Sequence, residues 1–229
     1  MKMNSYGRAV AMAASASLFL LGAQAQAQQS ATHSTSDHTH DHDHSHAHDD
    51  VSMDIRRGIF DDEQIKPRPL GNWEGDWQSV YPLLQNGTLD GVMAQKAEKG
   101  SKSADEYRAE YEAGYRTQVD RIVIDGSSVT FHEAGQSSQG TYEDDGYEVL
   151  TYKAGNRGVR YVFQKVSGDD AAPAFIQFSD HGIFPEDADH YHLYWGDDRA
   201  ALLEEVTNWP TYYPSTLSGE QIAEEMLAH

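Results

Sequence analysis

The segment "QVDRIVIDGSSVTFHEA" (residues 118–134) decides the fold class. Apolar and polar residues alternate on both sides of a central glycine, and this period of two around a glycine-containing turn predicts a β-hairpin. The same period continues in three more segments: "GTYEDDGYEVLTYKAGNRGVRYVFQKV" (140–166), "APAFIQFSDHGIF" (172–184) and "HYHLYWG" (190–196). We expect turns at Gly146 and in "AGNRG" (154–158). Consecutive strands joined by short turns predict an antiparallel meander, which either closes on itself or leaves bare edges.

Helices are expected on both sides of the strands. "SADEYRAEYEAGYRTQ" (103–118) predicts a helix that begins with a Ser103–Glu106 capping box. Its tyrosines recur every fourth residue, which indicates a packing stripe. Residues 70–87 predict a strand that leads into a turn or short helix. Further helices are expected at 88–100, where the pattern is weak, in "AALLEEV" (200–206), and in "EQIAEEMLA" (220–228), which Ser218 and Gln221 cap.

The first 27 residues have the features of a secretory signal peptide. Lys2 and Arg8 form a basic start, residues 9–21 are small and apolar, and "GAQAQA" (22–27) contains Ala-x-Ala cleavage signals. The apolar run is shorter than the ~20 residues that a membrane-spanning helix needs. We therefore expect a protein exported to the periplasm through a cleaved signal, with no membrane-embedded part.

Charge and cysteine content narrow the function. The formal net charge of −20 becomes −22 once Lys2 and Arg8 are removed with the signal. This charge argues against nucleic acid or an anionic membrane as partner and suits cations. With no cysteine in the chain, any metal must be held by nitrogen and oxygen ligands. Residues 52–229 are long enough for one domain with an ordinary core.

Three histidines come together if the last two strands form a hairpin. His190 and His192 are two residues apart and face the same side of their strand. His181, on the preceding strand, joins that side if it lies opposite either of them, whereas a one-residue slip breaks the set. Three imidazoles with an open fourth position form a typical zinc site. The fourth ligand would be water or a carboxylate of Glu186, Asp187 or Asp189; in the alternative interpretation, the histidines simply lie on a half-exposed strand.

A second run of histidines lies in residues 28–51, a segment with almost no apolar residues that is expected to be a disordered arm. Alternating histidines interleaved with Asp41 and Asp43 favour metal binding over a plain polar linker. Binding here should be weaker than in the folded domain, because the arm must first be ordered. The residues are His38, His40, His42, His44, His46 and His48.

Six motifs follow one another between about Gly58 and His229: "GIFDDEQI", "WEGDWQSVYPLLQNGTLD", "DGYEVLTYKAGNRGVRYVF", "IQFSDH", "HYHLYWG" and "NWPTYYPSTLSGEQIAEEMLAH". In these motifs the chain resembles the ZinT (YodA) family of periplasmic zinc- and cadmium-binding proteins. The resemblance covers nearly everything in that range, and it implies a lipocalin-like (calycin) β-barrel with added helices. It also implies that the family's metal-binding histidines fall on His181, His190 and His192. Unlike many relatives, this chain lacks a cysteine pair, and its histidine arm is longer.

The predicted function is therefore that of an exported zinc-binding protein, not an enzyme, which scavenges or buffers zinc. The resemblance implies delivery to the solute-binding protein of a zinc ABC transporter, and it implies cadmium binding. Nitrogen ligands also admit copper and nickel. Two alternatives remain open: a zinc-dependent hydrolase or hydratase that uses three histidines and a water, and a lipocalin-type carrier of small molecules.

Overall fold

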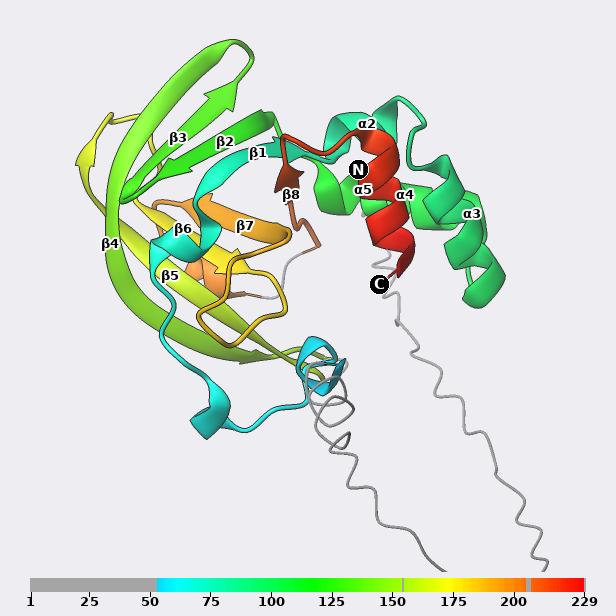
Figure 1. Cartoon of the computed structure of the whole chain (residues 1–229), viewed down its shortest axis with the longest axis horizontal. Helices are drawn as coiled ribbons and strands as arrows, with labels where there is room; N and C mark the ends of the chain where they lie inside the picture. Colours follow the sequence, from blue (N-terminus) through cyan, green and yellow to red (C-terminus); the bar gives the residue numbers. More distant parts are fainter. Residues whose placement is uncertain (1–52, 154, 205–206, 229) are drawn as a thin grey trace, which may run out of the picture. The chain divides into compact units, whose positions relative to one another are not determined.

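The computed structural model describes residues 53–153, 155–204 and 207–228 (Figure 1). The expected signal peptide (1–27) and histidine arm (28–51) lie outside these ranges. Eight strands pair in chain order to form a closed antiparallel barrel, as the alternating pattern predicted. They are β1 Gly75–Ser79, β2 Val119–Asp125, β3 Ser128–Glu133, β4 Gln136–Thr151, β5 Arg157–Gly168, β6 Phe175–Ser179, β7 Tyr191–Gly196 and β8 Thr211–Pro214.

The barrel closes between its first and last strands. Trp77 in β1 lies opposite Ile122 in β2 on one side and opposite Pro214 in β8 on the other. Closure removes the unpaired edges that an open meander would expose. Aromatic rings fill much of the interior, and among the buried ones are Trp73, Trp77, Phe131, Tyr142, Tyr161, Phe163, Phe178, Tyr191 and Tyr212.

Within the described residues, a group of α-helices lies beside β1 and β8 (Figure 1). The helices are α2 Tyr81–Gln85, α3 Asp90–Lys99, α4 Ala104–Tyr115 and α5 Gly219–Ala228, and the 3-10 helices are η1 Asp62–Gln64, η2 Leu70–Trp73 and η3 Ala201–Leu203. Residues 53–56 are also helical. Within the described ranges, no helix has the length and apolar character needed to cross a membrane.

The predicted helix caps are present. Ser103 accepts a hydrogen bond from the backbone of Glu106, whose carboxylate accepts one from the backbone of Ser103. Ser218 and Gln221 make the equivalent pair at the start of α5. The tyrosine stripe of α4 packs against a second apolar cluster, in which Tyr115 is buried. Its assignment to packing is therefore confirmed.

Two local predictions were wrong. Gly146 does not form a turn: β4 runs through it, and its φ of 82° accompanies a shift of register between Asp144 and Tyr147. A glycine can adopt this left-handed conformation inside a strand, where it produces a bulge. "AALLEEV" (200–206) forms only the 3-10 turn η3 among its described residues. Glu204 has an extended backbone (ψ 151°) that ends this turn, because the chain runs on to β8.

Candidate metal centre

The register between β6 and β7 is the one that brings the three histidines together. Ser179 lies opposite His192 at the end of the ladder, so continued pairing would set His181 opposite His190. The ladder stops before that point. His190 immediately precedes β7 and His181 lies two residues beyond β6, so the expectation that His181 is a strand residue was wrong.

A tight turn aims His181 instead. Its φ of 63° lies in the left-handed region, which is uncommon for a residue with a side chain. The preceding Asp180 holds this turn in place, because its Oδ1 accepts a hydrogen bond from the Gly182 backbone N–H at 3.1 Å. The same carboxylate accepts hydrogen bonds from Arg68 Nη1 at 2.6 Å and from Trp73 Nε1 at 3.1 Å.

Arg68 also binds the middle of the loop between β6 and β7, which comprises residues 180–190. Its Nη2 donates to the Glu186 carbonyl at 2.7 Å, and the backbone N–H of Ala188 donates to the Asn72 carbonyl at 2.8 Å. The Arg68 and Asp180 side chains are only 2% and 5% exposed. A buried, hydrogen-bonded ion pair thus connects the segment just before η2 to the loop that carries His181.

Thr211 orients His192. The Thr211 hydroxyl donates to the Trp209 carbonyl at 2.9 Å, so its oxygen is an acceptor for His192 Nδ1, which lies 2.8 Å away. The proton of the neutral imidazole therefore lies on Nδ1, and Nε2 keeps its lone pair. A hydrogen bond on one ring nitrogen that prepares the other is the usual arrangement of a metal-binding histidine.

The environment also keeps His192 neutral. Although part of the side chain is open to a cavity, desolvation by the surrounding protein lowers the pKa of His192 well below its ordinary value, and His181, His190 and Arg160 lower this pKa further. A low pKa favours the neutral form that binds metal. His190 is positioned differently: its ring stacks on Tyr213, with centroids 5.0 Å apart and planes 10° from parallel.

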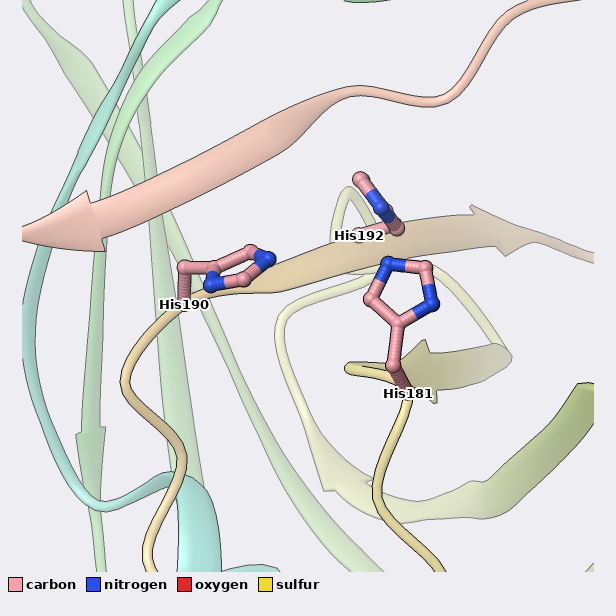
Figure 2. Close-up of side chains that lie close together, drawn as sticks. All are labelled: His181, His190 and His192. Atoms are coloured by element: carbon pink, nitrogen blue, oxygen red, sulfur yellow. The ribbon is translucent and has the colours of Figure 1, made fainter. Parts of the chain in front are cut away.

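The three imidazoles converge on one point. Figure 2 shows the His181 ring directed from its loop toward the ring of His192, with His190 beside them. Potential ligand nitrogens of the three residues all lie within 4.8 Å of one another. Small rotations of the side chains would bring such atoms to the 2.0–2.1 Å bond lengths of zinc–histidine coordination. The trio could therefore hold one metal ion.

The expected carboxylate ligands are not part of this group. Glu186, Asp187 and Asp189 line a cavity of about 970 Å³ that the three histidines also line, but among the described residues the cluster contains histidines only. His181 and His192 also line a second cavity of about 330 Å³. The candidate site is thus reached from two cavities. The arm histidines lie outside the described residues, and His132 lies in β3.

Sequence reasoning missed the residues that support the trio. Thr211 lies 19 residues after the histidine it contacts, and Arg68 lies 112 residues before Asp180. Neither pair has a recognisable spacing in the sequence. Asp180 was the one accessible clue, since an aspartate next to a histidine at the end of a strand favours a local turn.

A closed lipocalin-like barrel with converging histidines defines a class of metal-binding proteins. The chain belongs to the ZinT (YodA) family, described as periplasmic lipocalin-like zinc-recruitment, whose model matches residues 51–229. Family membership confirms the resemblance drawn from the sequence motifs.

Individual relatives agree with this assignment. "Probable metal-binding protein YrpE" of Bacillus subtilis (strain 168) is 57% identical over 182 residues, which are 79% of this chain and 72% of that protein. "Zinc-binding lipoprotein AdcA" of Streptococcus pneumoniae is 46% identical over 76% of this chain, but the match spans only 35% of AdcA. The crystal structure of the Zn(II)-bound ZinT-like domain of Streptococcus pneumoniae AdcA matches with a TM-score of 0.73 and 45% identity, covering 76% of this chain and 97% of that one.

Proposed function

We propose that the protein captures zinc outside the cytoplasm and that His181, His190 and His192 form its principal site. The observation that carries the proposal is the convergence of three imidazoles, with potential ligand nitrogens within 4.8 Å of one another, from a loop and a strand. Three neutral nitrogen ligands with an open fourth position suit Zn²⁺. The zinc-recruitment description of the family supports the choice of metal.

The ligand type of the proposed site limits its selectivity among divalent metal ions. Imidazole nitrogens bind copper and nickel as well as zinc. Selectivity must then come from geometry, which here depends on the turn at Asp180 and on the Thr211 hydrogen bond. Cadmium, which the family resemblance suggested, is the divalent ion to compare first with zinc.

The arm at residues 28–51 has a separate role in this proposal. Its six alternating histidines, His38 to His48, supply weak and exchangeable sites. Weak sites tethered to a domain raise the metal concentration around it, as any linked binding module does. The arm collects the metal, and the barrel retains it.

The zinc is then handed to an importer. AdcA carries a ZinT-like domain within a longer zinc-binding lipoprotein, and the matched part of this chain covers 35% of AdcA's length. We propose that the chain, exported through its N-terminal signal, passes zinc to the solute-binding protein of a zinc ABC transporter. Binding and transfer, not catalysis, are the proposed activity.

Calorimetric zinc titration tests the assignment. The mature protein is compared with a variant lacking residues 28–50, and the shortened variant then receives His190→Ala or, as a control, His132→Ala. Removing the arm should lower the stoichiometry but leave one tight site. His190→Ala should weaken that site by about a hundredfold or more, because one ligand in three is lost. His132→Ala should change nothing.

Two results would contradict the proposal. If the shortened protein bound no zinc tightly, the arm would be the principal site. If His190→Ala kept full affinity in the shortened protein, the tight site would lie elsewhere on the barrel.

A further inference from the structure

The smaller cavity beside the histidines is lined by positive charge. Its volume is about 330 Å³, and the residues that line it include Arg56, Arg157 and Arg160 together with His181 and His192. Among the described residues that line it, none is an aspartate or glutamate. In a chain with a net charge of −20, this concentration of arginine is unexpected unless the cavity receives an anion.

Arg160 is the buried arginine of this cavity, and part of its guanidinium has no hydrogen-bond partner among the described residues. It lies in β5, is 1% exposed, and its guanidinium carbon stands 3.2 Å from the centre of the Tyr194 ring. Its Nε and Nη1 are buried and find no hydrogen-bond partner within the part of the chain that the structure describes. Buried charges are normally paired, because desolvation is costly. Nε and Nη1 lie on different edges of the guanidinium, so an anion oxygen can accept a charge-assisted hydrogen bond from either of them.

The neighbouring arginines have different roles. Arg157 forms an ion pair with Asp62 and donates to the Phe60 carbonyl at 2.7 Å, so its charge is already balanced in part. Arg56 is exposed at the rim of both cavities. An anion that entered the smaller cavity would therefore meet Arg56 near the opening and Arg160 at the buried wall.

We propose that this cavity binds a small carboxylate or inorganic oxyanion, which Arg160 holds beside the metal of the histidine site. The contact between the anion and a metal rests on the function proposed above, whereas anion binding by Arg160 does not. Zn²⁺ on three neutral imidazoles keeps its full charge of two, and Arg160 adds a third positive charge nearby. An anion that reaches both centres neutralises them and supplies an oxygen for the open fourth position.

The anion offsets the repulsion between the metal and Arg160, so metal and anion should strengthen each other's binding. They should do so by the same factor, because coupling between two ligands is reciprocal. The species retained by the protein is a ternary complex of metal, anion and chain. The cavity's volume of about 330 Å³ is ample for a small carboxylate or an inorganic oxyanion. Acetate is a suitable probe for the carboxylate class, and sulfate is a suitable probe for the inorganic class.

The test uses the full mature chain with and without one equivalent of Co²⁺, a spectroscopic substitute for zinc. Acetate or sulfate is titrated in, and binding is followed by amide NMR shifts in the metal-free protein and by the visible Co²⁺ spectrum in the loaded protein. We expect saturable binding of at least one anion. Arg160→Gln should weaken this binding by at least about tenfold, because charge-assisted hydrogen bonds are lost. Arg116→Gln, which alters an exposed arginine that lines neither cavity, is the matched control.

The outcomes separate the two proposals. If Co²⁺ does not bind the histidines, the proposed function fails, but the metal-free NMR titration still tests the cavity. If neither anion shifts amides around the cavity, or if Arg160→Gln binds as the natural protein does, the anion site is overturned. Should Arg160→Gln fail to fold by circular dichroism, the exposed Arg56→Gln decides: about a threefold loss of anion affinity supports the site, and unchanged affinity overturns it.

Discussion

At the scale of single residues, the candidate site depends on side chains that do not themselves reach the metal. Asp180 fixes the turn that aims His181, and Thr211 fixes the tautomer of His192. Such partners commonly change metal affinity by 10- to 100-fold when they are removed. The histidines are the proposed ligands, and these neighbours orient their rings.

Thr211→Val should therefore weaken zinc binding by about 10- to 100-fold. Valine keeps the shape and the β-branched side chain that suits a strand, but it cannot accept the hydrogen bond from His192 Nδ1. Competition with a chromophoric chelator measures the change. Thr130→Val, in β3, is the control and should leave affinity unaltered; equal affinities in both variants would show that Thr211 does not orient the ligand.

The sequence predicted that the three histidines lie close together, but it did not predict the residues that surround them. His190 and His192 could be paired because a spacing of two on a strand fixes their common face. The conformation of His181 could not be predicted, since nothing in the local sequence requires a positive φ at a histidine. The contact between His192 and Thr211 depends on how β8 pairs with β7, which is a property of the closed sheet.

At the scale of elements, helix α4 holds the segment that leads into β8. The side-chain nitrogen of Asn208 donates to the carbonyls of Gly114 and Arg116, each at 2.9 Å, and the Trp209 backbone N–H donates to Gly114 at 2.6 Å. These bonds satisfy carbonyls that a helix end leaves without partners. Trp209 lines both cavities, so the helix end and the metal site share one segment.

Two glycine substitutions should have opposite effects on stability. A Cβ at Gly114 would lie 2.3 Å from the Trp209 ring, whereas a Cβ at Gly91 in α3 would meet nothing within 4 Å. Gly114→Ala should cost about 1–3 kcal/mol through overpacking. Gly91→Ala should be neutral or stabilise by up to about 1 kcal/mol, because alanine favours the helix. Urea denaturation measures both, and equal stabilities would contradict the role given to the Gly114–Trp209 contact.

The sequence predicted the elements where period and capping agreed. Helix α4 and helix α5 were recognisable from Ser103 and Ser218, and the hairpin from its alternation around Gly126. Gly146 was misread because a glycine in a strand marks either a turn or a bulge, and the choice depends on the partner strand. "AALLEEV" has helical propensity, but the connection from β7 to β8 leaves it only one turn.

At the scale of the whole molecule, pH couples metal binding to stability. The folded protein holds the pKa of His192 well below the ordinary value of about 6.5, chiefly through desolvation. The unfolded chain takes up a proton near pH 6.5, whereas folded His192 does not. Stability from this residue is thus fully present above that pH, and it is lost as the pH falls toward the folded pKa.

Zinc affinity should fall in the same direction, because protons compete for each imidazole. A site of three ordinary histidines would lose up to about a thousandfold per pH unit below their pKa. In this protein the loss of zinc affinity per pH unit should be smaller, because His192 has a lowered pKa and protons compete with zinc there only weakly. The zinc-induced rise in melting temperature, measured from about pH 7.5 to 5, should shrink accordingly. A rise that stayed constant would mean that carboxylates dominate the site.

The two cavities that meet at the histidines have a kinetic consequence. A zinc ion bound there can be approached by a new ligand from one side while the protein still holds it from the other. In the proposed transfer, metal–ligand bonds would then be exchanged one at a time, without an aquated intermediate. The rate of zinc loss, followed by stopped-flow mixing with a small chelator, should rise in proportion to chelator concentration; a rate independent of chelator would mean that the ion must leave before it is passed on.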